Sequence, residues 1–296
     1  METAFCANAA PAEGQAVCLA STNARSLPQR ARWPRIFPAW AAEVVSSNIV
    51  GYQKLSLVNG FTMIGTAFQT VGSNGQISVQ EIKGSGLTGV DWSFETEAGD
   101  TLMIWSPDDQ GYMTEFLYTG DTENEDMLSN GAKPGTWFDM GTYATADYTL
   151  KNGDAFWIVS SSSSASVTIA GEVPTSADSI SLVPGFNMIA NPFPVSVKVN
   201  DLFTATGLTG VDWTFETEAG DSLMIWDPSE QGYMTELLYS GDVATEAMTE
   251  NGAKPGTWFD MGAYATAEVE IPVGGAFWIV SSGSGTLTFK NPFSNE

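Results

Sequence analysis

The sequence contains no histidine, and this absence excludes several of the commonest catalytic and metal-binding arrangements. Histidine supplies the base of serine and cysteine hydrolase triads and many ligands of zinc and haem. The two cysteines, Cys6 and Cys18, both lie near the start of the chain. The rest of the chain therefore has no pair of thiols for a zinc ribbon, a redox motif or a disulfide framework.

Basic residues are also scarce, and their distribution sets the first 42 residues apart. The chain has 11 lysines and arginines against 35 aspartates and glutamates, a formal net charge of −24. Every arginine lies between Arg25 and Arg35. A surface this acidic repels nucleic acid and anionic membranes, so we expect no nucleic-acid partner. It favours solubility, cation uptake or a basic partner.

Long apolar runs are missing, so we expect no insertion into a membrane. Residues 1–42 are predicted to be an export leader or a disordered N-terminal segment. Ala39-Trp40-Ala41 fits the small-residue pattern of a signal cleavage site. Pro34, Arg35 and Pro38 interrupt the apolar run that usually precedes such a site. An export leader would place the protein at the cell surface or outside the cell.

The sequence does contain a long internal duplication. Residues 86–160 align without gaps with residues 207–281, and 54 of these 75 positions are identical. Upstream, residues 57–64 match residues 182–189. A period of about 120 residues is that of a whole domain rather than of a solenoid repeat. We therefore predict two homologous domains, at residues 43–173 and 174–296, which arose by a recent duplication.

The pattern of apolar residues predicts an all-β fold in both copies. Residues 101–105 and 112–118 flank a turn rich in proline, aspartate and glycine, which is typical of a β-hairpin. Residues 155–160 and 166–170 predict a second hairpin, and a third strand pair is expected around Asn59-Gly60. With about six or seven short strands, each copy would form a β-sandwich or a small β-barrel.

Helix is expected at one place only. A single turn is predicted over residues 201–205, with Asn200 or Asp201 as its N-cap.

Tryptophan recurs at four equivalent positions, and one pair is a candidate for binding a ligand. Trp137 and Trp258 each follow a Lys-Pro-Gly-Thr turn. An exposed indole there could stack on a sugar ring while Asp139 or Asp260 binds the sugar hydroxyls. Core packing is the alternative, and it is the one expected for the strand-embedded Trp105 and Trp157. The four pairs are Trp92/Trp213, Trp105/Trp226, Trp137/Trp258 and Trp157/Trp278.

Two equivalent acidic clusters are candidates for binding Ca²⁺, which prefers oxygen ligands. Both clusters end in Ala-Gly-Asp, a sequence equally typical of a solvated turn, and the chain has no EF-hand loop. No cofactor other than this Ca²⁺ is expected. The clusters are Glu95, Glu97 and Asp100 in the first copy, and Glu216, Glu218 and Asp221 in the second.

Paired carboxylates could also support glycoside hydrolysis, which requires two of them at a set separation in a cleft. The chain contains no nucleophile elbow, no Walker loop and no dinucleotide fingerprint. We therefore expect a protein that is not an enzyme and has no catalytic residues.

Several short motifs carry a resemblance to a known group of proteins. They are SSNIVGYQKLSL at 46–57, LVNGFTMI and LVPGFNMI at the start of the copies, ANPFP at 190–194, and AFWIVSS near the end of each copy. The chain resembles uncharacterised, exported bacterial β-rich repeat proteins whose mature chains often begin near SNIVGY. The resemblance implies export and a β-rich surface module.

Together these observations predict a non-enzymatic, exported cell-surface or extracellular protein with a structural or adhesive role. Glycans or cell-surface components are the expected partners, and the oligomeric state stays open. The alternatives are a carbohydrate-binding module that uses exposed tryptophan and, less favoured, a glycoside hydrolase.

Overall fold

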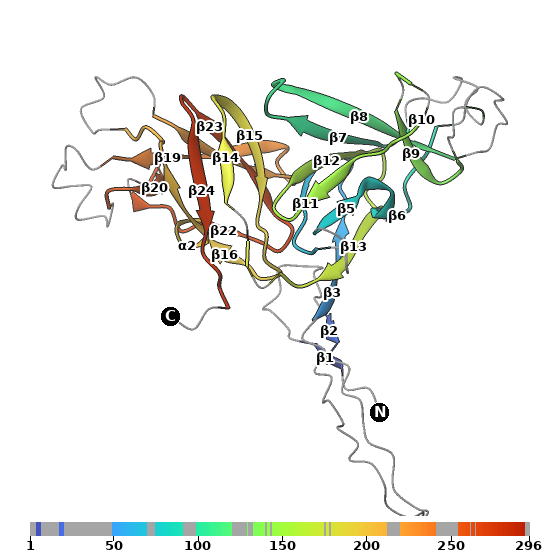
Figure 1. Cartoon of the computed structure of the whole chain (residues 1–296), viewed down its shortest axis with the longest axis horizontal. Coiled ribbons are helices and arrows are strands. Elements are labelled where there is room, and N and C mark those ends of the chain that lie inside the picture. Colours follow the sequence, from blue (N-terminus) through green and yellow to red (C-terminus); the bar gives the residue numbers. More distant parts are fainter. Residues whose placement is uncertain are drawn as a thin grey trace, which may run out of the picture.

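A computed structural model describes residues 4–6, 18–20, 49–69, 75–90, 99–119, 129, 133–139, 141–142, 144–174, 176–177, 179–211, 220–240, 254–260, 262–263 and 265–293. Nearly all secondary structure in these residues is β, which confirms the predicted fold class. Figure 1 shows two β-rich bodies side by side. We call residues 49–173 the first half and residues 174–293 the second half. No helix among the described residues has the length and apolar character needed to cross a membrane.

Each half holds 11 strands among its described residues, more than expected because several are only two or three residues long. The first half contains β3 (Val50–Ser56), β4 (Gly60–Gly65), β5 (Gln76–Ser78), the 3-10 turn η1 (Val79–Glu81), β6 (Lys83–Ser85), β7 (Thr101–Ser106), β8 (Gly111–Tyr118), β9 (Thr136–Asp139), β10 (Ala144–Thr145), β11 (Thr149–Lys151), β12 (Ala155–Ser160) and β13 (Ser166–Glu172). The second half contains β14 (Ile180–Leu182), β15 (Gly185–Ala190), β16 (Val197–Lys198), α2 (Val199–Leu202), β17 (Phe203–Thr206), β18 (Ser222–Asp227), β19 (Gly232–Tyr239), β20 (Thr257–Asp260), β21 (Ala265–Thr266), β22 (Glu270–Ile271), β23 (Ala276–Ser281) and β24 (Gly285–Phe289).

The strands of the two halves follow the same order in their sheets. The six-stranded sheet of the first half runs β10-β9-β8-β7-β12-β4, and that of the second half runs β21-β20-β19-β18-β23-β15. The first half adds a layer of β3, β13 and β6 with the ribbon β11-β5, and the second adds β14, β24 and β17 with β16-β22. Among the described residues no pairing closes either six-stranded sheet into a barrel, and each half is built of separate sheets.

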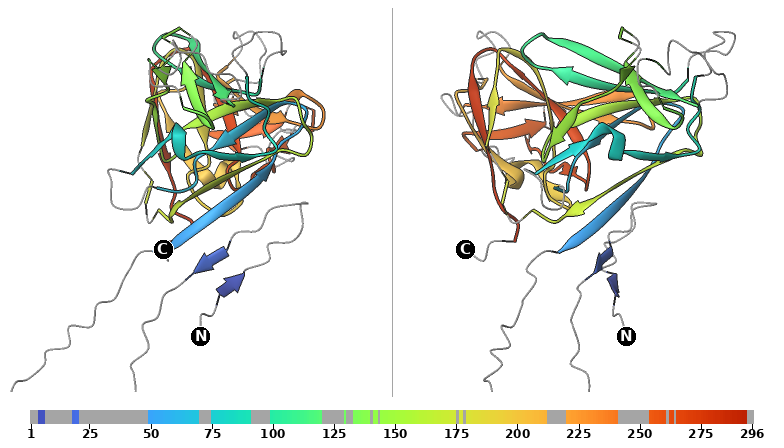
Figure 2. Two further views of the ribbon diagram at one scale, coloured as in Figure 1. Left: turned by 90° about the vertical axis from the view of Figure 1, so that its right-hand side faces the viewer. Right: turned by 45° about the vertical axis from the view of Figure 1, so that its right-hand side comes forward.

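Two segments of the predicted leader are strands. β1 (Ala4–Cys6) pairs with β2 (Cys18–Ala20), and Ala20 of β2 pairs with Val50 of β3. Figure 2 shows β3, in light blue, running from the first half toward these two strands. The other leader residues lie outside the described part of the chain, and the domain boundaries after residues 42 and 173 stay predictions.

The apolar core of each half lies between its layers. In the first half, Leu102 and Ile104 of β7 point into the core, as do Val167 and Ile169 of β13. β12 is buried along almost its whole length, because both faces of the six-stranded sheet are covered there. A strand buried on both faces requires a continuous apolar run, and Ala155–Val159 is one.

The strand positions are confirmed more fully than their pairing. β7 and β8 form the predicted hairpin. By contrast, β12 pairs with β4 and β7, while β13 pairs with β3 and β6, so two predicted hairpins are wrong. At each of these turns the chain crosses from one layer to the other. Alternating apolar residues identify a strand but leave its partner undetermined.

The predicted helical turn is displaced toward the N-terminus. α2 covers Val199–Leu202, its N-cap is Lys198, and no side chain caps it. Asn200 therefore does not serve as the N-cap. It lies inside the helix, and its side chain reaches another strand.

Candidate functional site

Trp137 and Trp258, the candidates for an exposed sugar-binding surface, are buried, which is the core-packing alternative. Their exposed fractions are 2% and 3%, and both indoles pack in the cores of their halves. Burial on this scale leaves no ring face for a sugar. The indole Nε1 of Trp137 donates a hydrogen bond to the Ile82 carbonyl at 3.4 Å.

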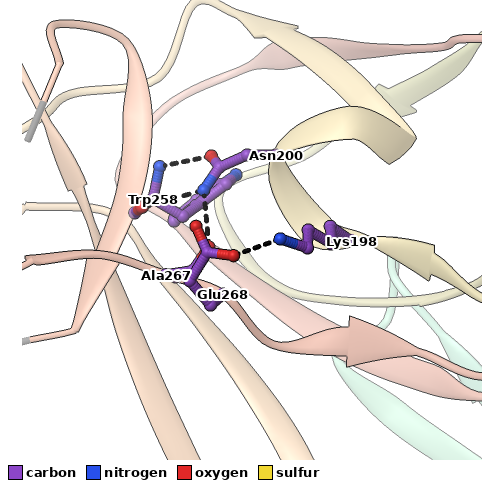
Figure 3. A network of polar contacts seen from close by, with 5 residues as sticks. All are labelled: Lys198, Asn200, Trp258, Ala267 and Glu268. Carbon is purple, nitrogen blue, oxygen red and sulfur yellow. Dashed lines mark hydrogen bonds and ion pairs between the residues drawn. The ribbon is translucent and has the colours of Figure 1, made fainter. Parts of the chain in front are cut away.

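A side-chain amide fixes the backbone at each of these tryptophans. Figure 3 shows Asn200 of α2 accepting a hydrogen bond from the Trp258 amide at 2.9 Å. Asn200 also donates to the carbonyls of Trp258 and Ala267, at 3.1 and 3.0 Å. An exposed ion pair between Lys198 and Glu268 lies beside this network and is expected to add little stability. The backbone of Trp258 is thus held against α2, and its ring packs in the core of the second half.

The first half uses a different amide for the same purpose. Gln80 of η1 accepts from the Trp137 amide at 3.1 Å and donates to the carbonyls of Trp137 and Ala146, at 2.8 and 2.9 Å. The role of these two tryptophans in packing is therefore the same in both halves.

The side chains of Asp139 and Asp260, proposed above as sugar ligands, stabilise the turns that follow them by accepting backbone hydrogen bonds. Asp139 Oδ1 accepts hydrogen bonds from the amides of Gly141 and Thr142, at 2.6 and 2.9 Å. Asp260 Oδ1 does the same with Gly262 and Ala263, at 2.6 and 3.2 Å. Neither aspartate adjoins an exposed indole, so the structure does not assemble the predicted sugar site.

The acidic clusters predicted to bind Ca²⁺ are described at one member each. Asp100 is buried, and its carboxylate accepts hydrogen bonds from the amides of Thr88 and Ser161, at 2.8 and 2.7 Å, and from the Ser161 hydroxyl at 3.0 Å. Asp221 accepts from the equivalent amides of Thr209 and Ser282. Both carboxylates join the two layers, which is a structural role. Glu95, Glu97, Glu216 and Glu218 lie outside the described residues, and the described part of the chain holds no group of three or more metal-ligating side chains.

Each half also holds a buried glutamate that the sequence analysis did not single out, and it lies beside one of the aspartates of the predicted sugar site. Glu115 of β8 lies opposite Asp139 of β9, and Glu236 lies opposite Asp260. Glu115 is fully buried, and neither of its carboxylate oxygens has a hydrogen-bond partner. Burial, together with the nearby Asp139 carboxylate, raises the pKa of Glu115 to about 7. Because no substrate can reach Glu115, this pair does not support glycoside hydrolysis.

A second cluster of tryptophans lies where the two halves meet. The outer faces of the six-stranded sheets pack together through Trp157 and Trp278, with methionine and alanine around them. The indole of Trp105 meets Trp278 with ring centroids 5.1 Å apart, and Trp157 meets Trp226 at the same distance. The buried members of this interface are Met63, Ala155, Trp157, Met188, Ala190, Ala276 and Trp278, and Met103, Trp105, Met224 and Trp226 pack against them.

The contacts across the interface are reciprocal. Gln110 accepts a hydrogen bond from the Phe186 amide at 2.7 Å and donates to the Phe186 carbonyl at 3.0 Å. Gln231 makes the same two contacts with Phe61, at 3.1 and 3.2 Å. Trp105 Nε1 also donates to the Phe186 carbonyl, at 2.8 Å. Such exchange of equivalent contacts is the geometry of a two-fold dimer, here built within one chain.

This docking explains two of the repeated sequence motifs. Gly185, at φ +99°, lies against Gln110, and a Cβ there would collide with the amide oxygen of Gln110. Gln110 itself has φ 48°, a conformation that is unfavourable for glutamine. The Gly-Phe of one half and the Gln-Gly of the other are thus the two sides of one contact.

An aromatic pocket of about 240 Å³ opens at the edge of this interface. Tyr112, Phe186 and Tyr233, each 42% exposed, form its rim. Tyr112 accepts a hydrogen bond from Trp157 Nε1 at 3.1 Å, and Tyr233 accepts one from Trp278 Nε1 at 3.2 Å. Burial raises the pKa of Tyr112, and the nearby Tyr233 raises it further. The pocket is lined by Trp105, Tyr112, Phe186, Met224, Tyr233 and Trp278.

The lining of the pocket determines what chemistry is available there. None of its residues carries a charge at neutral pH, so the pocket is suited to a neutral ligand. The two tyrosine hydroxyls use an oxygen lone pair to accept from indole, which leaves the hydroxyl hydrogens available for donation. Flat rings beside hydroxyl donors match a ligand with one apolar face and polar edges.

Comparison of the chain with protein-family models, with curated proteins and with solved structures gives no match.

Proposed function

We propose that this protein is a non-enzymatic, exported cell-surface or extracellular protein with a structural and adhesive role, and that it adheres by binding neutral glycans in the aromatic pocket. The pocket itself carries the proposal, because it combines solvent-exposed aromatic rings with two tyrosine hydroxyls able to donate. A pyranose presents an apolar face of C–H groups and a polar rim, which complements such a lining. The interface beneath the pocket provides a rigid support.

Export is supported by the resemblance of residues 46–57 to the start of mature exported repeat proteins. The acidic, histidine-free composition is consistent with a protein that neither binds nucleic acid nor catalyses by a histidine mechanism. A processed chain outside the cytoplasm of the native host would support this part of the proposal. An unprocessed cytoplasmic chain would contradict it.

The Tyr112→Ala/Tyr233→Ala double variant is expected to bind a glycan at least about tenfold more weakly than the unaltered chain. Each aromatic contact contributes about 0.5–1.5 kcal/mol beyond its buried area, and about 1.4 kcal/mol is a factor of ten. A glycan array followed by titration with the best neutral glycan measures the loss. Tyr52→Ala is the matched control, because Tyr52 is also 42% exposed but lies on β3, away from the pocket.

Two outcomes would refute the glycan proposal. One is an array on which the unaltered chain binds no glycan. The other is equal loss of binding in the double variant and in Tyr52→Ala. Tyr112→Phe/Tyr233→Phe separates stacking from hydrogen bonding, since it keeps the rings and removes only the hydroxyls.

A further inference from the structure

A second cavity, of about 630 Å³, lies where the turn between β11 and β12 of the first half meets β14 of the second half. Its lining is polar and includes one basic and one acidic side chain. The residues that line it are Gln69, Gly75, Lys151, Asn152, Asp154, Ser179, Ile180 and Ser181. The proposed glycan pocket shares none of these residues, so the two cavities are distinct.

This cavity lies at a point where the similarity of the two halves breaks down. The turn 151–154 reads Lys-Asn-Gly-Asp, whereas its counterpart 272–275 reads Pro-Val-Gly-Gly. Val273 packs into the core of the first half, and Gln53 donates a hydrogen bond to its carbonyl. The amide of Gly65 donates to the Gly274 carbonyl and the amide of Ala190 donates to the Gly153 carbonyl, both at 2.8 Å, so the two turns share this backbone contact and differ in their side chains. The first-half turn has no apolar side chain to insert, and a polar space remains beside it.

The hydrogen bonds of this turn leave one buried polar atom without a partner. Asn152 donates through Nδ2 to the carbonyls of Thr66 and Pro192, at 3.1 and 2.8 Å, yet its buried Oδ1 has no hydrogen-bond partner. Asp154 accepts from the Lys151 amide at 2.7 Å, and burial raises the pKa of its carboxyl. In the described part of the chain the ion pair found is Lys198–Glu268. The ammonium of Lys151 and the carboxylate of Asp154 line one cavity without an ion-pair contact, and the Lys151 charge acts on Asp154 by opposing the rise in its pKa.

We propose that this cavity binds a zwitterionic α-amino acid. The ligand ammonium would bind the Asp154 carboxylate, which lines the cavity and can accept further hydrogen bonds beside the one from the Lys151 amide. The ligand carboxylate would bind the Lys151 ammonium and the hydroxyls of Ser179 or Ser181. A neutral sugar would leave both charges uncompensated, and a simple cation would be repelled by Lys151.

Calorimetric titration of the full chain with the free amino acids tests this proposal. At least one is expected to bind with a Kd in the range of about 1 µM to 1 mM. The N-acetyl derivative and the methyl ester of the same amino acid should each bind at least about tenfold more weakly, because each removes one charge. If no free amino acid binds, or if the blocked forms bind equally well, the proposal fails.

The chain supplies its own matched variant. Lys151→Pro/Asn152→Val/Asp154→Gly copies the turn that already folds at residues 272–275, so it should retain the melting temperature and lose amino-acid binding. Asp154→Asn provides a milder test: it keeps an oxygen to accept from the Lys151 amide, removes the charge, and should weaken binding at least about tenfold. It also carries the test should the triple variant not fold. Undiminished binding by Asp154→Asn would overturn the proposal, whereas neither variant should alter glycan binding in the aromatic pocket.

Discussion

Trp278→Ala is expected to lower the free energy of unfolding by about 3–5 kcal/mol and to loosen the first half as well as the second. Trp278 is 3% exposed, and its ring meets Trp105 at 5.1 Å and Phe186 at 5.7 Å. Its Nε1 also donates to the Tyr233 hydroxyl, so the variant removes a support of the aromatic pocket. Chemical denaturation measures the loss of stability. Amide hydrogen exchange shows where the structure loosens.

Trp258→Ala is the control for this variant. Trp258 is the same residue type at the same 3% exposure, but it lies on the core side of its sheet. Its loss should cost a similar free energy while faster exchange stays within the second half. Faster exchange in β4 and β7 is expected for Trp278→Ala alone. The interface account would be contradicted if exchange in those strands were unchanged in Trp278→Ala.

Glu115→Gln is expected to remove much of a pH dependence of stability between about pH 4.5 and pH 7. The pKa of Glu115 is raised by burial and by Asp139, so the folded chain holds this proton more tightly than the unfolded chain. The stability that the folded chain gains by holding this proton is fully present below the ordinary carboxyl pKa. It is lost as the pH rises through the folded pKa of about 7. Above pH 7 the loss amounts to up to about 3 kcal/mol, since each pKa unit corresponds to about 1.4 kcal/mol.

Urea denaturation of both chains at pH 5 and pH 8 measures this effect. The change in free energy of unfolding caused by Glu115→Gln should be more stabilising at pH 8 than at pH 5. At pH 8 the glutamate is charged while buried, and glutamine has no charge to bury. Glu236→Gln should change in the same direction, since burial and Asp260 raise the pKa of Glu236. Glu230→Gln removes the same charge at an exposed position and serves as the control. An identical effect of Glu115→Gln at both pH values would argue against this role of the buried glutamate.

The sequence was sufficient to predict the fold class and most strand positions. Period-two alternation at residues 112–118 and the continuous apolar run at 155–159 are local features, and each predicts a strand. Which strand pairs with which is not determined by the local sequence. A turn of a few residues can close a hairpin or carry the chain between layers, and only the packing of the whole half distinguishes these. Two of the three predicted strand pairs were wrong for this reason.

The candidate site could be predicted less well, because it belongs to neither half alone. Trp105 was expected to be in the core, but its ring lies at the junction with Trp278 of the other half. Trp137 follows a turn, which made it a candidate for exposure with core packing as the alternative, but it lies in the core, where Gln80 holds its backbone. The sequence signals that could have revealed the interface were the repeated Gly-Phe and Gln-Gly motifs. In the structure they meet through Gln110 and Phe186, which are 76 positions apart. Without the fold, nothing pairs one motif with the other.

Nuclear Overhauser effects between indole rings test most directly the claim that the two halves dock through their tryptophans. The interface predicts cross-peaks between Trp105 and Trp278 and between Trp157 and Trp226, since both pairs have ring centroids 5.1 Å apart. Single Trp→Phe variants assign the cross-peaks, because each removes the signals of one indole ring. Both sets of cross-peaks are expected in the full chain. Their absence, with contacts inside each half intact, would contradict the interface and remove the basis of the aromatic pocket.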